Sequence, residues 1–195
     1  MDSMNKQEQD ARPGRVSRQI KVLGLVACAV MLVGPSAAQA GSGGVGVGGG
    51  GNGGGKTVAG GKAKLRNGKA IAPRNAPAKV KRAIAAGNKI AGKPYVYGGG
   101  HGSWKDNGYD CSGAVSYVLG KPGARVLKAP MPSGSFSSFG RAGKGKWITT
   151  YSNSGHMYVM VAGLRFESHT QGDGPSWSKQ KATKGGYVKR HPKSL

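Results

Sequence analysis

A run of glycine sets the first limit on what this chain can fold into. Residues 41–61 contain 13 glycines among 21 residues, and their largest apolar side chain is valine. Such a segment cannot bury enough apolar surface to offset the entropy of ordering its backbone. The residues that follow, 62 to about 74, are basic and polar, and we expect them to be irregular too. We therefore predict a flexible tether over residues 41–74 and one small domain over residues 75–195.

The segment before the glycine run has the three parts of a secretory signal peptide. Basic residues between Arg12 and Lys21 precede the apolar run VLGLVACAVMLVG, and Ala38-Gln39-Ala40 fits the small-x-small cleavage pattern. We expect residues 1–40 to be removed on export to the periplasm, the cell wall or the medium. The apolar run is short for a bilayer span, so a retained transmembrane helix is the weaker alternative. A second alternative is a lipoprotein, because LVAC resembles a lipoprotein box that would place a lipid on Cys28.

The charge of the chain points to an anionic partner. Of its 30 Lys and Arg and seven Asp and Glu, 25 and four remain without residues 1–40, a formal charge of +21. An anionic cell-wall polymer or membrane surface suits this charge in an exported protein. The basic residues are scattered from Lys56 to Lys193 without interleaved aromatic residues or a nucleic-acid-binding motif. This distribution argues against specific nucleic-acid recognition, and a generally cationic, solubilising surface is the alternative.

Within residues 75–195, hydrophobic spacing predicts helices first and strands afterwards. NAPAKVKRAIAAGNKIAG predicts a helix capped by Asn75 and closed by Gly92, and Asp110 is predicted to begin a second helix. The buried stripe of the second helix is Ala114, Val115, Val118 and Leu119. KWITTY and GHMYVMVAGLRFESH predict an antiparallel hairpin flanked by at least one more strand. Helices followed by strands indicate an α+β fold with the helix packed on one face of the sheet.

The C-terminal part carries weaker signals. Trp147 lies in a predicted strand and Trp177 in a predicted C-terminal loop, and we expect both rings in the core rather than as platforms for sugars. The basic tail GGYVKRHPKSL is expected to pack at the edge of the domain.

Cys111 is the one cysteine that remains if residues 1–40 are removed. Exported proteins usually pair their cysteines, so an unpaired thiol is a buried apolar filler, an intermolecular link or a nucleophile. Cys111 is predicted to lie in the first turn of the helix that Asp110 begins. Unpaired backbone N–H groups and the positive end of the helix dipole favour the thiolate there, and the same N–H groups can hold a developing oxyanion.

A nucleophilic thiol needs a base, and the chain has four histidines, at positions 101, 156, 169 and 191. His156 begins a predicted strand, which favours it as the base, and His169 lies on the return strand, where it can orient the His156 ring. The alternative for either is an ordinary core or surface histidine. A zinc site of Cys111, His156 and His169 is disfavoured because these residues lack the close ligand pairs of structural zinc sites. No metal or other cofactor is predicted.

Three motifs, KPYVYGG, YDCSGAVSYVL and SGHMYVMVAG, together resemble the NlpC family of bacterial cell-wall cysteine peptidases over residues 75–170. The resemblance implies a papain-like α+β domain in which the helix bearing the cysteine packs on a central antiparallel sheet. It also implies hydrolysis of peptide bonds in peptidoglycan stem peptides, commonly the bond between D-glutamate and a diamino acid. Two alternatives remain: a wall-binding protein of the same fold without catalysis, and a cationic structural or polyanion-binding protein.

The resemblance also assigns roles to single residues. Cys111 resembles the nucleophile and His156 the general base, and Tyr95 resembles the tyrosine that fixes the substrate or the oxyanion near the nucleophile. Asp110 is expected to cap the helix, and Ser112 to touch substrate. A purely structural role for both is the alternative.

The third catalytic position has three candidates. Counting forward from the hairpin turn selects His169, which we predict, whereas counting from His156 selects Ser168, and Glu167 is the nearby acid.

The loop GGGHGSWKDNGY is longer than the usual version of the family, so that His101 and Trp104 either line a modified cleft or lie on a surface loop.

Overall fold

The structure is a computed structural model that describes residues 56–169 and 174–195. The predicted signal peptide with Cys28, and most of the glycine run, lie outside the described residues. In the part of the chain that is described, no helix has both the length and the apolar character needed to cross a bilayer.

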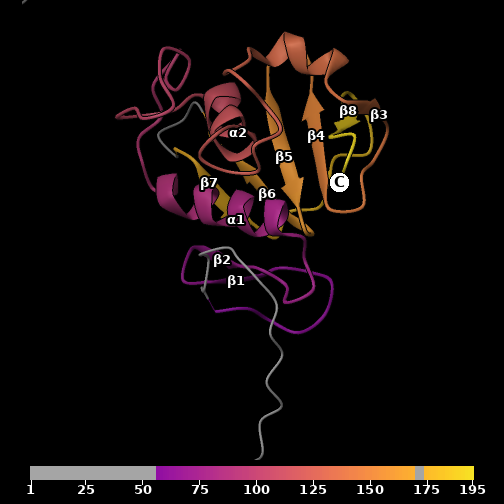
Figure 1. The fold of residues 1–195 in the computed structure, drawn as a ribbon. Helices are drawn as coiled ribbons and strands as arrows, with labels where there is room; N and C mark the ends of the chain where they lie inside the picture. Colours follow the sequence, from indigo (N-terminus) through magenta and orange to yellow (C-terminus); the bar gives the residue numbers. More distant parts are fainter. Residues whose placement is uncertain (1–55, 170–173) are drawn as a thin grey trace, which may run out of the picture. The chain divides into compact units, whose positions relative to one another are not determined.

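A six-stranded antiparallel sheet forms the centre of the fold, with the strand order β3-β8-β4-β5-β6-β7 (Figure 1). The strands are β3 (Arg141–Ala142), β4 (Ile148–Ser152), β5 (Met157–Val161), β6 (Leu164–Glu167), β7 (Ser176–Ser178) and β8 (Val188–His191). The predicted hairpin is β5 and β6, with Val159 opposite Phe166. Ala162 and Gly163 join the two strands with φ values of 47° and 88°, as a two-residue turn that follows the right-handed strand twist requires.

Two α-helices cover one face of this sheet. They are α1 (Ala78–Ile90) and α2 (Cys111–Leu119), and a 3₁₀ helix, η1, spans Ser133–Ser138. The two α-helices contact each other, and α2 packs on β5 and β6. The four predicted core positions of α2 are fully buried: Ala114, Val115, Val118 and Leu119. The structure therefore confirms the α+β class and the packing of the cysteine-bearing helix on a central antiparallel sheet.

The predicted cap of α1 is wrong. The N-cap residue is Pro77, without a side-chain capping hydrogen bond, and Asn75 is exposed. A proline disfavours helical backbone in the residue before it, so that the helix begins only after Pro77. Gly92 follows the helix in the left-handed region, with φ of 87°, which agrees with its predicted place at the helix end.

Residues 62–74 are not irregular, which corrects the predicted boundary of the tether. They contain a second, two-stranded sheet of β1 (Lys64–Arg66) and β2 (Lys69–Ile71). Asn67 and Gly68 form its turn, with φ values of 47° and 70°. Both values are positive, and an Asn-Gly pair is the sequence that adopts such a turn most readily.

The hairpin β1–β2 is attached to the rest of the domain. The Asn88 side chain on α1 accepts a hydrogen bond from the Ala70 amide and donates one to the Ala70 carbonyl, both at 2.8 Å. The amide of Ala63 donates to the carbonyl of Ala162 in the β5–β6 turn at 2.8 Å. Figure 1 shows β1 and β2 beside α1. The ordered domain therefore begins before residue 75.

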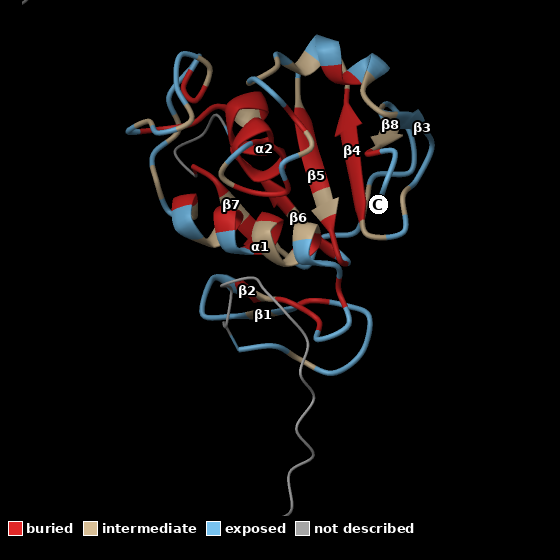
Figure 2. Cartoon of the chain, viewed as in Figure 1, coloured by how far each residue is buried: buried red, intermediate tan, exposed pale blue. Residues whose placement is uncertain are grey.

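The C-terminal segments are also more regular than predicted. Trp177 lies in strand β7 rather than in a loop, and its buried ring packs against Phe166 with ring centroids 4.6 Å apart, which confirms its place in the core. Trp147 is half-buried against the same core. Figure 2 shows that β4, β5 and β6 are buried along most of their length. The basic tail contributes β8, which lies between β3 and β4 in the sheet, and none of its four residues is fully buried.

Candidate active site

Cys111 is the first residue of α2, as predicted. The N-cap residue is Asp110, whose Oδ1 accepts a hydrogen bond from the Gly113 amide at 2.6 Å. Cys111 is half-buried and its thiol is free. Among the described residues, the backbone N–H groups of Cys111 and Ser112 have no hydrogen-bond partner. The site therefore combines a thiol with two free donors at the positive end of a helix.

His156 lies directly before β5 and reaches Cys111 from the sheet. A hydrogen bond with Cys111 is the largest contribution that raises the pKa of His156 to about 9, a hydrogen bond with Glu167 adds to it, and partial burial opposes both. His156 Nε2 lies 3.1 Å from Glu167 Oε2, so that Nδ1 is the ring nitrogen that Glu167 does not hold. Asn153 Oδ1 accepts from the amide of His156 at 2.8 Å and thereby holds its backbone.

Glu167 is the buried acid behind His156. Its side chain is 2% exposed, and Oε2 accepts hydrogen bonds from both His156 and Arg165. The Arg165 guanidinium in turn lies over the Tyr158 ring, 3.7 Å from its centroid. Burial alone would raise the pKa of Glu167, but the hydrogen bonds from His156 and Arg165 and the nearby positive charges outweigh it and lower this pKa below its usual range. Glu167 is thus an anion in the site.

His169 does not orient the His156 ring as predicted. It is exposed, at 46% of its side chain, and its Nε2 lies 3.4 Å from Glu167 Oε1. The β5–β6 register, continued by three residues, puts His169 opposite His156, and the two rings stack with centroids 5.8 Å apart and an angle of 24°. Ring nitrogens bond in the plane of the ring, so stacked imidazoles cannot bond each other. The other candidate, Ser168, donates to the Tyr109 carbonyl at 2.9 Å instead.

Tyr95 lies in the neighbourhood of the thiol. It follows Pro94 and is half-buried. Partial burial raises the pKa of Tyr95, and the charges of Cys111 and Asp110 raise it further. The phenol therefore keeps its proton at neutral pH and can donate a hydrogen bond beside Cys111.

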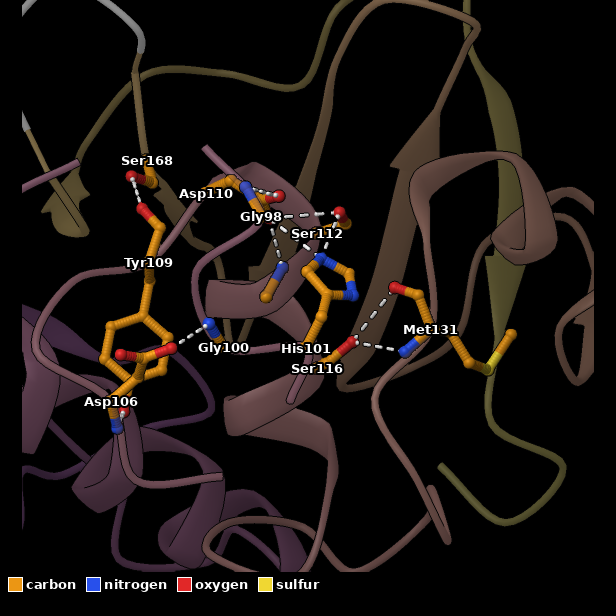
Figure 3. A network of polar contacts seen from close by, with 11 residues as sticks. Gly98, Gly100, His101, Asp106, Tyr109, Asp110, Ser112, Ser116, Met131 and Ser168 are labelled. Carbon is orange, nitrogen blue, oxygen red and sulfur yellow. Dashed lines mark hydrogen bonds and ion pairs between the residues drawn. The ribbon is translucent and has the colours of Figure 1, made fainter. Parts of the chain in front are cut away.

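His101 joins Asp110 and Ser112 in one polar cluster at the start of α2 (Figure 3). His101 Nε2 lies 3.1 Å from Asp110 Oδ1 and 3.1 Å from Ser112 Oγ, and Ser112 Oγ donates to Asp110 Oδ1 at 3.1 Å. Asp110 Oδ2 accepts from the Gly98 amide at 3.1 Å. Asp110 caps the helix as predicted, and its contacts and those of the buried Ser112 are within the protein. The long glycine-rich loop was the signal that pointed to His101.

Metal ligation is the other chemistry that the site residues can offer. One atom each of His156, Glu167 and His169 lies within 4.8 Å of the others. Two observations oppose a cation there: the Arg165 guanidinium already binds Glu167, and His156 holds a proton at neutral pH. A metal ion requires a deprotonated imidazole, so the arrangement suits proton transfer better than metal ligation.

No family model and no curated protein matches the chain. Among solved structures, the peptidoglycan hydrolase RipB from Mycobacterium tuberculosis aligns with a TM-score of 0.46 and 22% identity, over 58% of this chain and 64% of that chain. A cysteine variant of RipA, a protein that interacts with the resuscitation promoting factor, aligns with a TM-score of 0.44 and 24% identity, over 58% of this chain and 62% of that one. The chain thus spans less than two thirds of either structure, and its function is argued below from its own residues.

Proposed function

We propose that the protein is an exported cysteine peptidase that hydrolyses peptide bonds in the stem peptides of peptidoglycan. One observation carries the proposal: Cys111 at the start of α2 lies near enough to His156 to raise its pKa, and His156 Nε2 lies 3.1 Å from the buried carboxylate of Glu167. A nucleophile, a base and a group that orients the base form the arrangement of covalent acyl-transfer catalysis. The resemblance of the three motifs to the NlpC family supplies the substrate class and the bond between D-glutamate and a diamino acid.

In the first half of the reaction, the Cys111 thiolate attacks the carbonyl carbon of the scissile amide. The oxyanion accepts hydrogen bonds from the backbone N–H groups of Cys111 and Ser112 and from the Tyr95 hydroxyl. The imidazolium of His156 donates its proton to the leaving nitrogen, the carbon–nitrogen bond breaks, and an amine leaves while a thioester remains on Cys111.

In the second half, neutral His156 takes a proton from a water molecule, and the hydroxide attacks the thioester carbonyl. The carbon–sulfur bond breaks, the acid is released, and the thiolate and imidazolium form again. Glu167 stays ionised throughout and stabilises the imidazolium, while Arg165 keeps Glu167 ionised at its buried position.

The charge of the chain supports a location at an anionic surface. The formal charge of +21 after removal of residues 1–40 favours association with anionic cell-wall polymers. This association is expected to weaken strongly with salt, because exposed charges are screened within about 10 Å at 0.1 M ionic strength. Salt-independent sedimentation with isolated cell walls would contradict it.

Digestion of purified peptidoglycan by the full chain and by Cys111→Ala tests the reaction. Two substrates, one with diaminopimelate and one with lysine in the stem, identify the bond and the preferred diamino acid when the products are analysed by mass spectrometry. We expect new stem-peptide fragments from the unaltered chain and from Ser137→Ala, an exposed control far along the chain in η1. Fragments that persist with Cys111→Ala would overturn the assignment. Binding of muropeptides without cleavage would favour a non-catalytic wall-binding protein of the same fold.

A further inference from the structure

A pocket at the far end of α2 is separate from the residues proposed for catalysis. It has a volume of about 630 Å³, and ten residues from α1, the loop before α2, α2 itself and the segment after it line its walls. Cys111 begins the nine-residue helix, whereas Tyr117 and Lys121 line the pocket near its end. We propose that this aromatic-basic pocket binds a sugar unit that carries a phosphate or carboxylate group, as part of an anionic glycopolymer. The choice of a wall polymer as its source rests on the proposed function.

Three aromatic residues give the pocket its shape. Tyr109 and Tyr117 are buried and meet edge to face, with ring centroids 5.4 Å apart. Trp104 is half-buried, and its indole packs so closely on Gly120 that a Cβ atom at that position would overlap the ring. The indole is therefore held in place with part of its surface accessible. An aromatic face fixed in this way is a platform for the apolar face of a sugar ring.

One hydroxyl in the pocket lacks a partner. The Tyr109 hydroxyl is occupied, since it donates to the Trp104 carbonyl at 2.8 Å and accepts from the Asp106 amide at 3.0 Å. The Tyr117 residue is only 5% exposed, and its hydroxyl has no hydrogen bond with any described residue. The hydroxyl oxygen is not fully enclosed, so it can bond to water or to a ligand in the pocket. A ligand hydroxyl or oxyanion that reaches Tyr117 replaces that water in a hydrogen bond that the protein does not supply.

Positive charge surrounds the same pocket. Half of the residues that line it are cationic and none is acidic: Lys89, Lys93, Lys105, Lys121 and Arg125. Lys93 is committed to the protein, because its Nζ donates to the Asp106 carbonyl at 2.5 Å and lies 5.8 Å from the Tyr109 ring centroid. The other four are exposed, and none of them pairs with a carboxylate among residues 56–169 and 174–195, so they can bind an anion. A concave site with cations on its rim and no carboxylate concentrates anions.

The combination distinguishes between classes of anion. Inorganic phosphate would use the cations alone, whereas a charged sugar uses the cations, the Trp104 face and the Tyr117 hydroxyl together. Single-stranded nucleic acid is bound by a row of aromatic platforms along a charged groove, whereas this partly open pocket offers one accessible indole. A charged sugar unit is therefore the ligand that uses every feature of the pocket.

Such a site would increase the rate of hydrolysis on intact cell walls. Holding one polymer at the end of α2 raises the local concentration of the stem peptides available to Cys111 at its start. The effect disappears on short soluble stem peptides, which carry no polymer.

Titration of the full chain with small probes tests the site, with Trp fluorescence and calorimetry as readouts. The probes are N-acetylglucosamine 1-phosphate, glucuronate, uncharged N-acetylglucosamine and inorganic phosphate, and oligo-dT serves as the nucleic-acid probe. We expect one or both charged sugars to bind at least about tenfold more tightly than the uncharged sugar and inorganic phosphate, which corresponds to about 1.4 kcal/mol. The first two probes distinguish a phosphate from a carboxylate source.

Two variants separate the pocket from the general charge of the protein. Lys89→Ala with Lys121→Ala removes two cations of the pocket, and Lys128→Ala with Lys146→Ala removes two exposed cations elsewhere. We expect the first pair to weaken binding of the charged sugar by about five- to tenfold and the second by less than about twofold. Tyr117→Phe should weaken it by about fivefold, as for one hydrogen bond, without affecting inorganic phosphate.

Three results would overturn the proposal. The first is that the two lysine pairs weaken binding of the charged sugar equally. The second is that inorganic phosphate binds as tightly as the charged sugar and that Tyr117→Phe has no effect. The third is that oligo-dT binds more tightly than the charged sugar and depends on the same residues. Hydrolysis of soluble stem peptides and binding of the charged sugars, both measured on the unaltered chain, separate this proposal from the proposed function. Hydrolysis without sugar binding refutes the pocket alone, and sugar binding without hydrolysis refutes the peptidase alone. The Lys89→Ala, Lys121→Ala protein should hydrolyse soluble stem peptides at an unchanged rate.

Discussion

Two histidine–carboxylate pairs lie on opposite sides of Cys111 in the chain and share the same Nε2–O distance of 3.1 Å. In the pair on the sheet, Glu167 is buried and its other strong partner is the cation Arg165. In the pair at the start of α2, Asp110 accepts further hydrogen bonds from two backbone amides, Gly98 and Gly113, and from a hydroxyl (Figure 3). Cys111 raises the pKa of His156, whereas the hydrogen-bond partners of His101 are Asp110 and Ser112.

The difference shows that a histidine–carboxylate distance does not identify a catalytic base. A cation behind Glu167 keeps a buried carboxylate charged, and this charge is then available to stabilise an imidazolium. The charge of Asp110 is shared among donors that hold the glycine-rich loop and the helix start together. The sheet pair is thus arranged for proton transfer and the loop pair for structure, and each of the following changes tests that division.

The largest difference is expected between the two histidines themselves. His156→Ala removes the proton donor and acceptor and should lower kcat/KM on a synthetic stem peptide by about 10²- to 10⁴-fold. The rate of Cys111 alkylation at pH 7 should fall as well, because the thiolate loses its counter-ion. His191→Ala on β8 is the matched control and should leave both rates unchanged. A loss of less than tenfold in His156→Ala would contradict the assignment of the base.

The next change tests the third catalytic position. Glu167→Gln keeps the shape of the side chain but removes the charge that stabilises the imidazolium, and should lower kcat by about 10²-fold or more. His169→Ala is the matched comparison, since it removes an exposed ring that stacks on His156 without bonding it; a loss below about fivefold is expected. If His169→Ala lost more activity than Glu167→Gln, the position predicted from the sequence would be the correct one.

Local chemistry explains which parts of this site were predictable. An aspartate before an apolar helical stripe is a capping signal, and it placed Cys111 correctly in the first turn of α2. The hairpin β5–β6 was predictable because alternation and a two-residue turn are both local patterns. The Asn67-Gly68 turn of β1–β2 was an equally local signal, but the strands on either side have only three residues each, many of them basic.

The rest depends on contacts between distant segments. Alternation put Glu167 and His169 on the same face of the predicted return strand, and only the stacking of two rings and the position of Arg165 distinguish them. Likewise, nothing in the residues around Val188 indicates that β8 inserts between β3 and β4, because that pairing joins segments about 40 residues apart. Contacts between residues that are far apart in the chain cannot be predicted from the spacing of residues along it.

The dependence of activity on pH follows from the raised pKa of His156. The usual histidine pKa lies near 6.5, and the folded value is about 9, so the imidazolium is fully present below pH 6.5 and is lost as pH rises through about 9. We expect kcat/KM on a soluble stem peptide to decline with a midpoint near pH 9, by about tenfold for each further pH unit. A decline centred near pH 6.5 would mean that Cys111 and Glu167 do not stabilise the imidazolium.

Arg165 is expected to act through Glu167, and its effect should be smaller and should depend on pH. Arg165→Met removes the cation, so that burial raises the pKa of Glu167. The acid limb of the pH profile, which is the fall in activity as Glu167 takes up a proton at low pH, then moves to higher pH. Activity near pH 5 should fall by about tenfold while activity at pH 8 changes less. Arg165→Lys retains the charge and should restore most of the acid limb. A loss that is equal at every pH would indicate a purely structural role for Arg165 at the Tyr158 ring.

The smallest effect is expected in the loop pair. His101→Ala leaves Asp110 with the donors of Gly98, Gly113 and Ser112, so that the helix cap survives and the free energy of unfolding should fall by only about 1 kcal/mol. Because the loop beside the thiol is held less firmly, KM should rise by up to about threefold while kcat and the alkaline midpoint stay unchanged. Denaturant unfolding and a pH profile measure both quantities. A shift of the alkaline midpoint in His101→Ala would show that His101 is coupled to the Cys111–His156 pair, and the division between a catalytic and a structural pair would then be wrong.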